Sequence, residues 1–148
     1  MKQKQGNAAE IKFLLLNLEM GYTVSRPFGE QSRYDLIVDT GITLERVQVK
    51  STSRKDLTNG MDCYNCQVYT QGYVKRKYVK SNSNSKKYIL KKYTKKEIDF
   101  IAIYVVPEGA WYKIPIEEIN GYNVKLYPHR KSRTNKFEKY RMNLNTDK

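Results

Sequence analysis

Two short segments joined by four residues constrain the fold of this chain more than any other feature of the sequence. In each of residues 34–39 and 44–51, apolar side chains recur at every second position, as Leu36 and Val38 do in the first segment and Val47 and Val49 in the second. Because successive side chains of a strand point to opposite faces, each segment is predicted to form a half-buried strand. The intervening residues 40–43 have the length of a hairpin loop, so the strands are expected to pair antiparallel. The expected core positions are Leu36, Val38, Val47 and Val49.

The register of this hairpin decides which polar side chains meet. With a four-residue loop, Asp39 pairs with Leu44, and Asp35 lies opposite Gln48. Directly opposed residues share a face, with Cβ atoms about 4.5–5.5 Å apart. Lys50 lies on the same face as Gln48, so a carboxylate, an amide oxygen and an ammonium are expected to converge. On spacing alone, an ordinary Asp–Lys pair on a surface hairpin is the commoner explanation of so short a pattern.

The residue types at this point suit metal-dependent chemistry on phosphate. Carboxylate and amide oxygens are hard ligands for Mg²⁺, which keeps several waters and binds phosphate. A bound metal would lower the pKa of a water and hold the scissile phosphate. Lys50 would hold or deprotonate the attacking water and offset charge in the transition state.

The rest of the pattern predicts a mixed α/β fold with one sheet and few helices. Residues 7–20, with Asn7 as a cap, carry apolar side chains at helical spacing and end before Gly21, a common helix-closing residue. Residues 100–106 are the most apolar segment and are expected to form an interior strand. Residues 56–60 have the composition of a turn. The apolar stripe of the helix consists of Ile11, Leu14, Leu15 and Leu18. Further strands are expected at residues 22–26, 61–73, 111–114 and 122–127.

An excess of basic residues favours a polyanionic partner. The 148 residues contain 28 Lys and Arg against 15 Asp and Glu, a formal charge of +13. Residues 63–96 contain ten basic residues and no acidic one, and residues 125–141 contain seven basic residues against Glu138 alone. Solvated faces normally mix both signs, so these blocks are interpreted as the phosphate-binding segments of a nucleic-acid-binding protein. An acidic membrane or protein surface would also fit the charge.

The first basic block is predicted to form a projecting hairpin. Residues 73–80 and 86–93 are basic and aromatic, and they flank a Ser/Asn-rich loop at residues 81–85. A two-stranded ribbon of this kind fits the major groove of DNA. The DNA-contacting segments are expected at about residues 73–96 and 125–141. The individual contacts are expected to be Arg76, Lys77, Tyr78, Lys86, Lys87, Arg130 and Lys131, together with Ser51, Arg54 and Lys55 near the alternating strands.

The helix and the hairpin together resemble the PD-(D/E)XK nuclease family. The core of that family is a helix carrying a Glu, followed by a hairpin with Asp on one strand and (Glu/Asp/Gln)-x-Lys on the next. Here Glu10 lies in the predicted helix, and Asp35 and the sequence Gln48-Val49-Lys50 lie on the two strands. The resemblance implies a restriction-endonuclease-like core, with a central mixed β-sheet, an N-terminal helix and the projecting basic β-hairpin. The resemblance covers about residues 6–53, and the length of 148 residues fits a single nuclease domain over the whole chain.

The resemblance further implies a divalent-metal site with two departures from the family pattern. Tyr34 stands where a Pro usually precedes the Asp, and Gln48 replaces the usual acidic residue, which removes one negative charge from the metal site. Glu10 therefore gains weight as a second carboxylate, although the helix dipole equally explains an acid near a helix N-terminus. The implied catalytic residues are Glu10, Asp35, Gln48 and Lys50. The implied ligands of Mg²⁺, for which Mn²⁺ would substitute, are Asp35, Gln48, Val49 and Glu10.

Among enzymes of this kind, the chain resembles the small homing endonucleases encoded in bacterial group I introns, and the Holliday-junction resolvases look similar over the same residues. The preferred interpretation is thus a sequence-specific endonuclease that hydrolyses double-stranded DNA. A nuclease like the Holliday-junction resolvases and a non-catalytic basic nucleic-acid-binding module are the alternatives. One such site cuts one strand, so a double-strand cut implies a homo-oligomer, either a dimer or a tetramer.

The cysteines and the absence of an export signal suggest a reducing, cytoplasmic environment. Cys63 and Cys66 form one C-x-x-C pair and His129 is the only histidine, which is too few ligands for a zinc site within one chain. We therefore expect free thiols. No apolar run approaches the roughly 18 residues that a membrane-spanning helix needs, so no membrane association by a span is expected.

Overall fold

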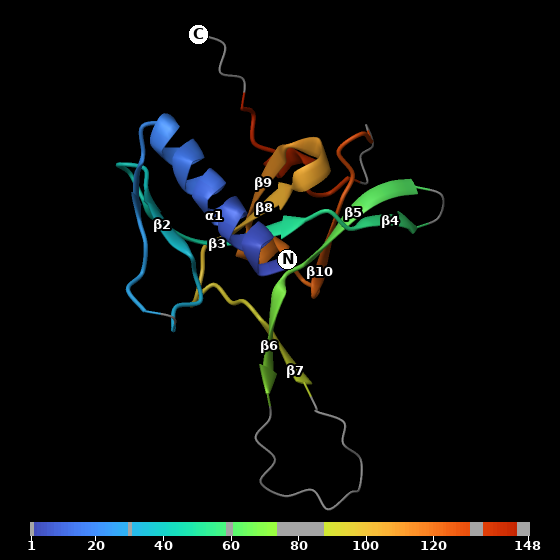
Figure 1. The fold of residues 1–148 in the computed structure, drawn as a ribbon, viewed down its shortest axis with the longest axis horizontal. Coiled ribbons are helices and arrows are strands. Elements are labelled where there is room, and N and C mark those ends of the chain that lie inside the picture. The colour runs from blue at the N-terminus through green and yellow to red at the C-terminus, as the bar shows by residue number, and fades with distance from the viewer. Residues whose placement is uncertain (1, 30, 59–60, 74–87, 131–134, 145–148) are drawn as a thin grey trace, which may run out of the picture.

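The computed structural model describes residues 2–29, 31–58, 61–73, 88–130 and 135–144, and its centre is a five-stranded mixed sheet (Figure 1). The strand order is β1-β2-β3-β8-β9. Neighbouring strands are antiparallel except β3 and β8, which run parallel. The strands are β1 (Thr23–Ser25), β2 (Leu36–Asp39), β3 (Leu44–Thr52), β8 (Phe100–Val105) and β9 (Ala110–Pro115). The interior position predicted for the 100–106 segment is confirmed, because β8 lies between β3 and β9.

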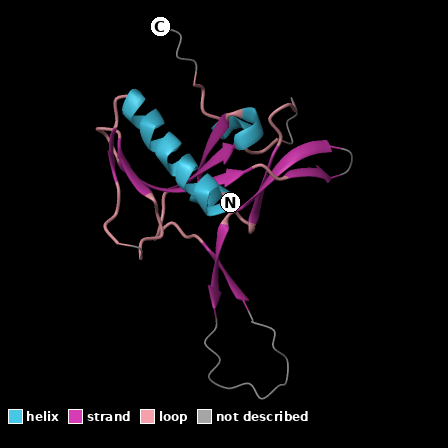
Figure 2. Cartoon of the chain, viewed as in Figure 1, coloured by secondary structure: helices cyan, strands magenta, loops and turns pink. Residues whose placement is uncertain are grey.

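The helix α1 (Lys2–Glu19) covers one face of this sheet (Figure 2). Phe13 is fully buried on that face, with its ring centroid 5.1 Å from that of Trp111 in β9. The four alternating positions of β2 and β3 that were expected to be core are all buried in the same cluster. This packing fixes the polar side chains between them on the other face of the sheet.

Two predictions about α1 are wrong. The helix begins at Lys2, so Asn7 lies inside it and caps nothing. Its buried side runs through Ala9, Phe13 and Asn17, whereas most of the predicted apolar stripe faces solvent. Phe13 is the larger anchor, and residues four apart share its side of the helix, which turns the stripe away from the sheet. The exposed members of the stripe are Ile11, Leu15 and Leu18. The predicted end is confirmed, since Gly21 has a φ of 84° and its N–H donates to the Leu18 carbonyl at 2.9 Å.

The other face of the central sheet packs against a second, three-stranded sheet ordered β10-β5-β4. Its strands are β4 (Lys55–Thr58), β5 (Met61–Gln67) and β10 (Asn123–Leu126). The prediction of a single sheet is therefore wrong. The turn predicted at residues 56–60 is wrong for residues 56–58, which belong to β4, and residues 59–60 lie outside the described residues. Pairing with β5 turns the polar residues of β4 into an edge strand, which overrides their weak intrinsic strand preference.

A two-stranded hairpin, β6 (Tyr69–Tyr73) and β7 (Tyr88–Lys92), projects from the body (Figure 1). Its second strand falls within the arm predicted at residues 86–93, whereas its first strand precedes nearly all of the arm predicted at residues 73–80. The two strands pair from Tyr69 with Lys92 to Tyr73 with Tyr88. Residues 74–87 lie outside the described residues, and with them the predicted contacts Arg76, Lys77, Tyr78, Lys86 and Lys87; Lys131 lies outside them as well.

Three short 3-10 turns complete the described chain. They are η1 (Val106–Glu108), η2 (Ile116–Glu118) and η3 (Glu138–Tyr140). None of the helices in the described residues combines the length and apolar character that a membrane crossing requires.

Candidate active site

The register of β2 and β3 is the one predicted from the loop length. Asp39 pairs with Leu44, and Gly41 takes a φ of 82° while its N–H donates to Asp39 Oδ1 at 2.8 Å, which closes the four-residue loop. Asp35 immediately precedes β2 and donates its N–H to the Val47 carbonyl at 2.9 Å. The chain therefore brings Asp35 opposite Gln48.

Asp35 and Gln48 contact each other directly. Gln48 Nε2 donates to Asp35 Oδ2 at 2.7 Å, and the backbone N–H of Val49 donates to the same oxygen at 2.7 Å. The sequence predicted that the amide oxygen would converge with the carboxylate, whereas the amide nitrogen faces Asp35. This difference follows from chemistry, because an ionised carboxylate accepts hydrogen bonds and only the nitrogen end of the amide donates them.

Glu10 and Asp35 line a common cleft of about 380 Å³. Glu10 reaches it from the middle of α1 and forms an ion pair with Arg26 at 2.9 Å. Because Glu10 lies two turns inside the helix, the helix dipole does not account for its position. The cleft is lined by Glu10, Arg26, Pro27, Gly29, Ser32, Tyr34 and Asp35.

Burial is the main influence on the Asp35 carboxyl. It raises the pKa of Asp35 to about 6, and the negative charge of Glu10 raises it further, while the Val49 N–H, Lys50 and Gln48 lower it. Asp35 forms no ion pair among the described residues, so the charge of Lys50 offsets the cost of burying the carboxylate only in part. A bound cation would therefore stabilise the ionised form of this carboxylate.

Lys50 lies on the same face of β3 as Gln48, but its ammonium is not bonded to the Asp35 carboxylate. Its Nζ lies 5.5 Å from the centroid of the buried Tyr93 ring. It is close enough to lower the pKa of Asp35. The Lys50 ammonium therefore acts on Asp35 through space without forming an ion pair with it, and neither Lys50 nor Gln48 is among the residues that line the cleft.

The remaining predicted contacts lie away from this cleft, because none of the four that the structure describes lines it. Ser51 is half-buried and, by strand alternation, faces the α1 side of β3. Lys55 is exposed and forms an ion pair with Asp62 at 3.0 Å. Arg54 is exposed after β3, and the guanidinium of Arg130 lies 5.8 Å from the Tyr127 ring.

Sequence reasoning missed Arg26 as a cleft residue and the role of Arg33. Neither belongs to an alternating pattern or to a basic block, and each is placed by a partner distant in the chain: Arg26 by Glu10, and Arg33 by the base of the β6–β7 hairpin.

The cysteines match their prediction as free thiols, since both are buried and form no disulfide. Burial raises the pKa of Cys66 to about 12.

The raised pKa of Asp35 predicts a measurable dependence of stability on pH. The native pKa of about 6 exceeds the unfolded value of about 3.9, so the native state binds the proton more tightly. The contribution of Asp35 to the free energy of unfolding should therefore fall as pH rises from about 4 to about 6 and stay low above that.

Replacing Asp35 with asparagine is accordingly expected to raise the free energy of unfolding at neutral pH, without metal, by about 2 kcal/mol. Urea denaturation across this pH range measures it. Asp39→Asn, at the exposed end of β2, should not reproduce the gain. An Asp35→Asn protein with the same pH profile as the wild type would contradict the burial argument.

Comparison with known proteins identifies the family and the fold. The model of the PD-(D/E)XK endonuclease family matches residues 1–143. Among solved structures, the bacterial homing endonuclease I-Ssp6803I is similar in fold, with a TM-score of 0.74, 22% identity, and coverage of 94% of this chain and 87% of that one. Hjc, a Holliday junction resolvase from Archaeoglobus fulgidus, is similar with a TM-score of 0.46, 17% identity, and coverage of 84% of this chain and 88% of that one. No curated protein matches the chain in sequence.

Proposed function

The chain belongs to the PD-(D/E)XK endonuclease family, and we propose that it is a homing-type endonuclease that hydrolyses phosphodiester bonds in double-stranded DNA with a divalent metal. The observation that carries this proposal is the contact of Gln48 with Asp35, which itself lines a cleft together with Glu10. The fold, which is restriction-endonuclease-like with a mixed sheet and an N-terminal helix, supplies this contact through β2 and β3.

The donor set at the cleft fits a hard cation that retains water. The described residues contain no group of three or more His, Cys, Asp or Glu side chains that could hold a metal, which argues against an all-protein cage. Asp35 and Glu10 supply carboxylates, Gln48 an amide oxygen and Val49 a backbone carbonyl. Mg²⁺ typically binds through one or two carboxylates and keeps several waters, and Mn²⁺ accepts similar oxygen ligands. Such a cation, when bound, would acidify a water and neutralise charge on the phosphate.

Each side chain of this set has a task that follows from its surroundings. The Gln48 amide can turn about its last bond to offer its oxygen in place of its nitrogen. Glu10 becomes a ligand when it leaves Arg26, which is 60% exposed and free to move toward a phosphate. The ammonium of Lys50 would hold the attacking water and offset the negative charge that develops on the phosphate.

The partner that we propose is double-stranded DNA, bound by a homo-oligomer. The formal charge of +13 supplies the attraction to phosphate, and the projecting β6–β7 hairpin is the element with the shape to enter a major groove. One cleft per chain cuts one strand, so a double-strand cut requires a dimer or a tetramer.

Incubation with a linear duplex beside a four-way DNA junction, in Mg²⁺ and in chelator, tests this function. We expect the linear duplex to be cut in Mg²⁺ and left intact in chelator. Cutting of the junction alone would replace the homing-type proposal with a resolvase-like one. Binding of DNA with no cutting in Mg²⁺ or Mn²⁺ would replace both with a non-catalytic nucleic-acid-binding module.

A further inference from the structure

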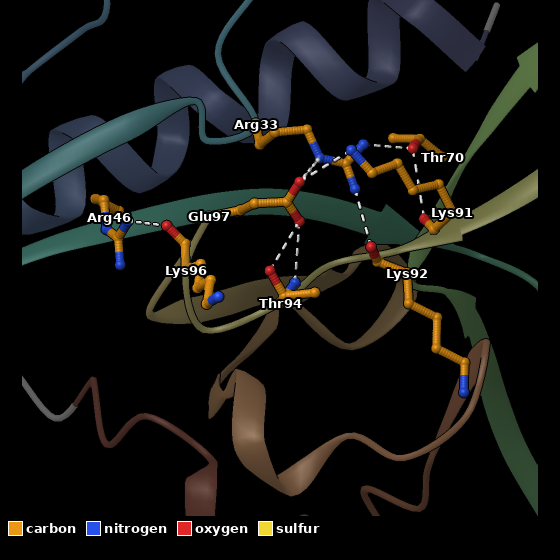
Figure 3. Close-up of polar contacts among 8 residues, drawn as sticks. All are labelled: Arg33, Arg46, Thr70, Lys91, Lys92, Thr94, Lys96 and Glu97. Carbon is orange, nitrogen blue, oxygen red and sulfur yellow. Dashed lines mark hydrogen bonds and ion pairs between the residues drawn. The ribbon is translucent and has the colours of Figure 1, made fainter.

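Arg33 joins the base of the β6–β7 hairpin to the strand that carries Asp35 (Figure 3). It lies two residues before Asp35, and its side chain is 21% exposed. Its guanidinium reaches both strands of the hairpin: Nη1 donates to Thr70 Oγ1 in β6, and Nη2 donates to the Lys92 carbonyl in β7 at 3.1 Å. Thr70 and Lys92 belong to adjacent register pairs, so one side chain holds both strands where the hairpin leaves the body.

Glu97 fixes the guanidinium from the opposite side. Its Oε1 lies 3.3 Å from Arg33 Nε and 3.0 Å from Lys91 Nζ. Its Oε2 accepts the N–H and the hydroxyl of Thr94 at 3.1 and 3.2 Å. Although burial opposes it, these partners lower the pKa of Glu97, so the carboxylate stays ionised and holds Arg33. Arg33, Thr70, Lys92 and Glu97 are called the hairpin junction below.

The hairpin junction is linked to Lys50 by the ring of Tyr93. The Arg33 guanidinium lies 4.4 Å from the centroid of the Tyr93 ring, and Lys50 Nζ lies 5.5 Å from the same centroid. Tyr93 is buried and directly follows β7. The base of the hairpin is therefore linked to Lys50 by the Tyr93 ring. It is linked to Asp35 by Arg33, which lies two residues before Asp35 in the chain.

From this arrangement we propose that Arg33 is a positioning residue that couples the grip of the hairpin on DNA to the placement of Asp35 and Lys50. The inference rests on the proposed function. When the hairpin binds a duplex, its displacement is passed to the start of β2 by Arg33 and to Lys50 by Tyr93. A lysine at this position keeps the charge but cannot bond Thr70, the Lys92 carbonyl and Glu97 together, because it lacks the planar fork of arginine.

Single-turnover cleavage by Arg33→Lys separates this role from a purely structural one. The DNA concentration for half-maximal cleavage should stay within about threefold of wild type, while the rate at saturating DNA falls about 10- to 100-fold, the loss typical of a misplaced reacting group. Thr70→Val should lower the saturating rate in the same direction, and its effect should not add to that of Arg33→Lys.

Arg46→Lys is the matched control. All three guanidinium nitrogens of Arg46 also donate hydrogen bonds, to Asp99 and to the carbonyls of Lys95 and Lys96. Arg46 contacts neither the hairpin nor the cleft. This variant should lower the melting temperature as Arg33→Lys does, yet keep the saturating rate. An unchanged saturating rate in Arg33→Lys, or an equal loss in Arg46→Lys, would overturn the coupling while leaving the proposed function intact.

If wild type binds DNA without cutting it, the proposed function is rejected but the coupling is not. A second measurement then tests the coupling. The Val49 N–H donates to Asp35 and reports on its placement. Duplex binding should slow hydrogen exchange of this amide in wild type but not in Arg33→Lys. Equal slowing in both proteins would overturn the coupling, and a wild type that binds no duplex would overturn both proposals.

Discussion

Replacing Lys50 with alanine is expected to lower the rate of DNA cleavage at saturating DNA by about 10³-fold and to leave DNA affinity nearly unchanged. Lys50 lies on the polar face of β3 and acts on Asp35 without forming an ion pair with it, so in the proposed function its charge would act on the reacting phosphate more than on the fold. Interactions made mainly in the transition state change the rate at saturation and not the binding. Single-turnover cleavage and a binding titration in chelator measure the two quantities separately.

Lys12→Ala is the matched control for Lys50→Ala. Lys12 also lies over a tyrosine, 4.7 Å from the Tyr104 ring centroid, but it is on α1 and, unlike Lys50, is not among the charges that shift the pKa of Asp35. Its removal should change neither rate nor affinity beyond about twofold, as for most surface substitutions. A parallel loss of binding and cutting in Lys50→Ala would identify a structural lysine and contradict the catalytic role.

The second large effect on DNA cleavage is expected at Gln48, where two substitutions should have opposite effects. Gln48→Leu keeps similar bulk but removes the amide oxygen, so cleavage should be lost in both Mg²⁺ and Mn²⁺. Gln48→Glu replaces a neutral ligand with a charged one and should cut at a lower metal concentration than wild type. Cleavage of a duplex across a Mg²⁺ and Mn²⁺ series measures both variants against wild type.

The paired design also excludes a simple structural explanation. Gln48→Glu places a second carboxylate against Asp35 Oδ2, where like charges repel, so without metal this variant should be less stable than wild type. Added divalent metal should restore its melting temperature. A Gln48→Leu protein that cuts as well as wild type, or a Gln48→Glu protein indifferent to metal, would contradict the metal role of this residue.

The central contact could be predicted from the sequence because it is local. Asp35 and Gln48 are 13 residues apart, and strand alternation together with a four-residue loop leaves one register that buries Val38 and Val47. The identity of the family followed from the same few residues with Glu10. The single-domain organisation and the DNA contacts within residues 74–87 stay predictions.

What the sequence could not supply depends on contacts between distant segments. The buried side of α1 is chosen by Phe13 against Trp111, 98 residues later in the chain, and not by the count of apolar residues on each side. Lys55–Thr58 becomes a strand only because β5 pairs with it. Arg33 reaches Thr70 and Lys92, 37 and 59 residues away, and no periodic pattern marks such a pairing.

Strand cleavage of an end-labelled, randomised duplex library by wild type and by Asp35→Asn, near neutral pH with Mg²⁺, tests the proposed site most directly. Asparagine keeps the shape of Asp35 and can still accept the Val49 N–H, and the fold is expected to be more stable with it. We predict that wild type cuts in Mg²⁺ but not in chelator, and that the folded Asp35→Asn protein binds the library without cutting. Cleavage by Asp35→Asn at the wild-type rate would contradict the assignment of the active site to this cleft.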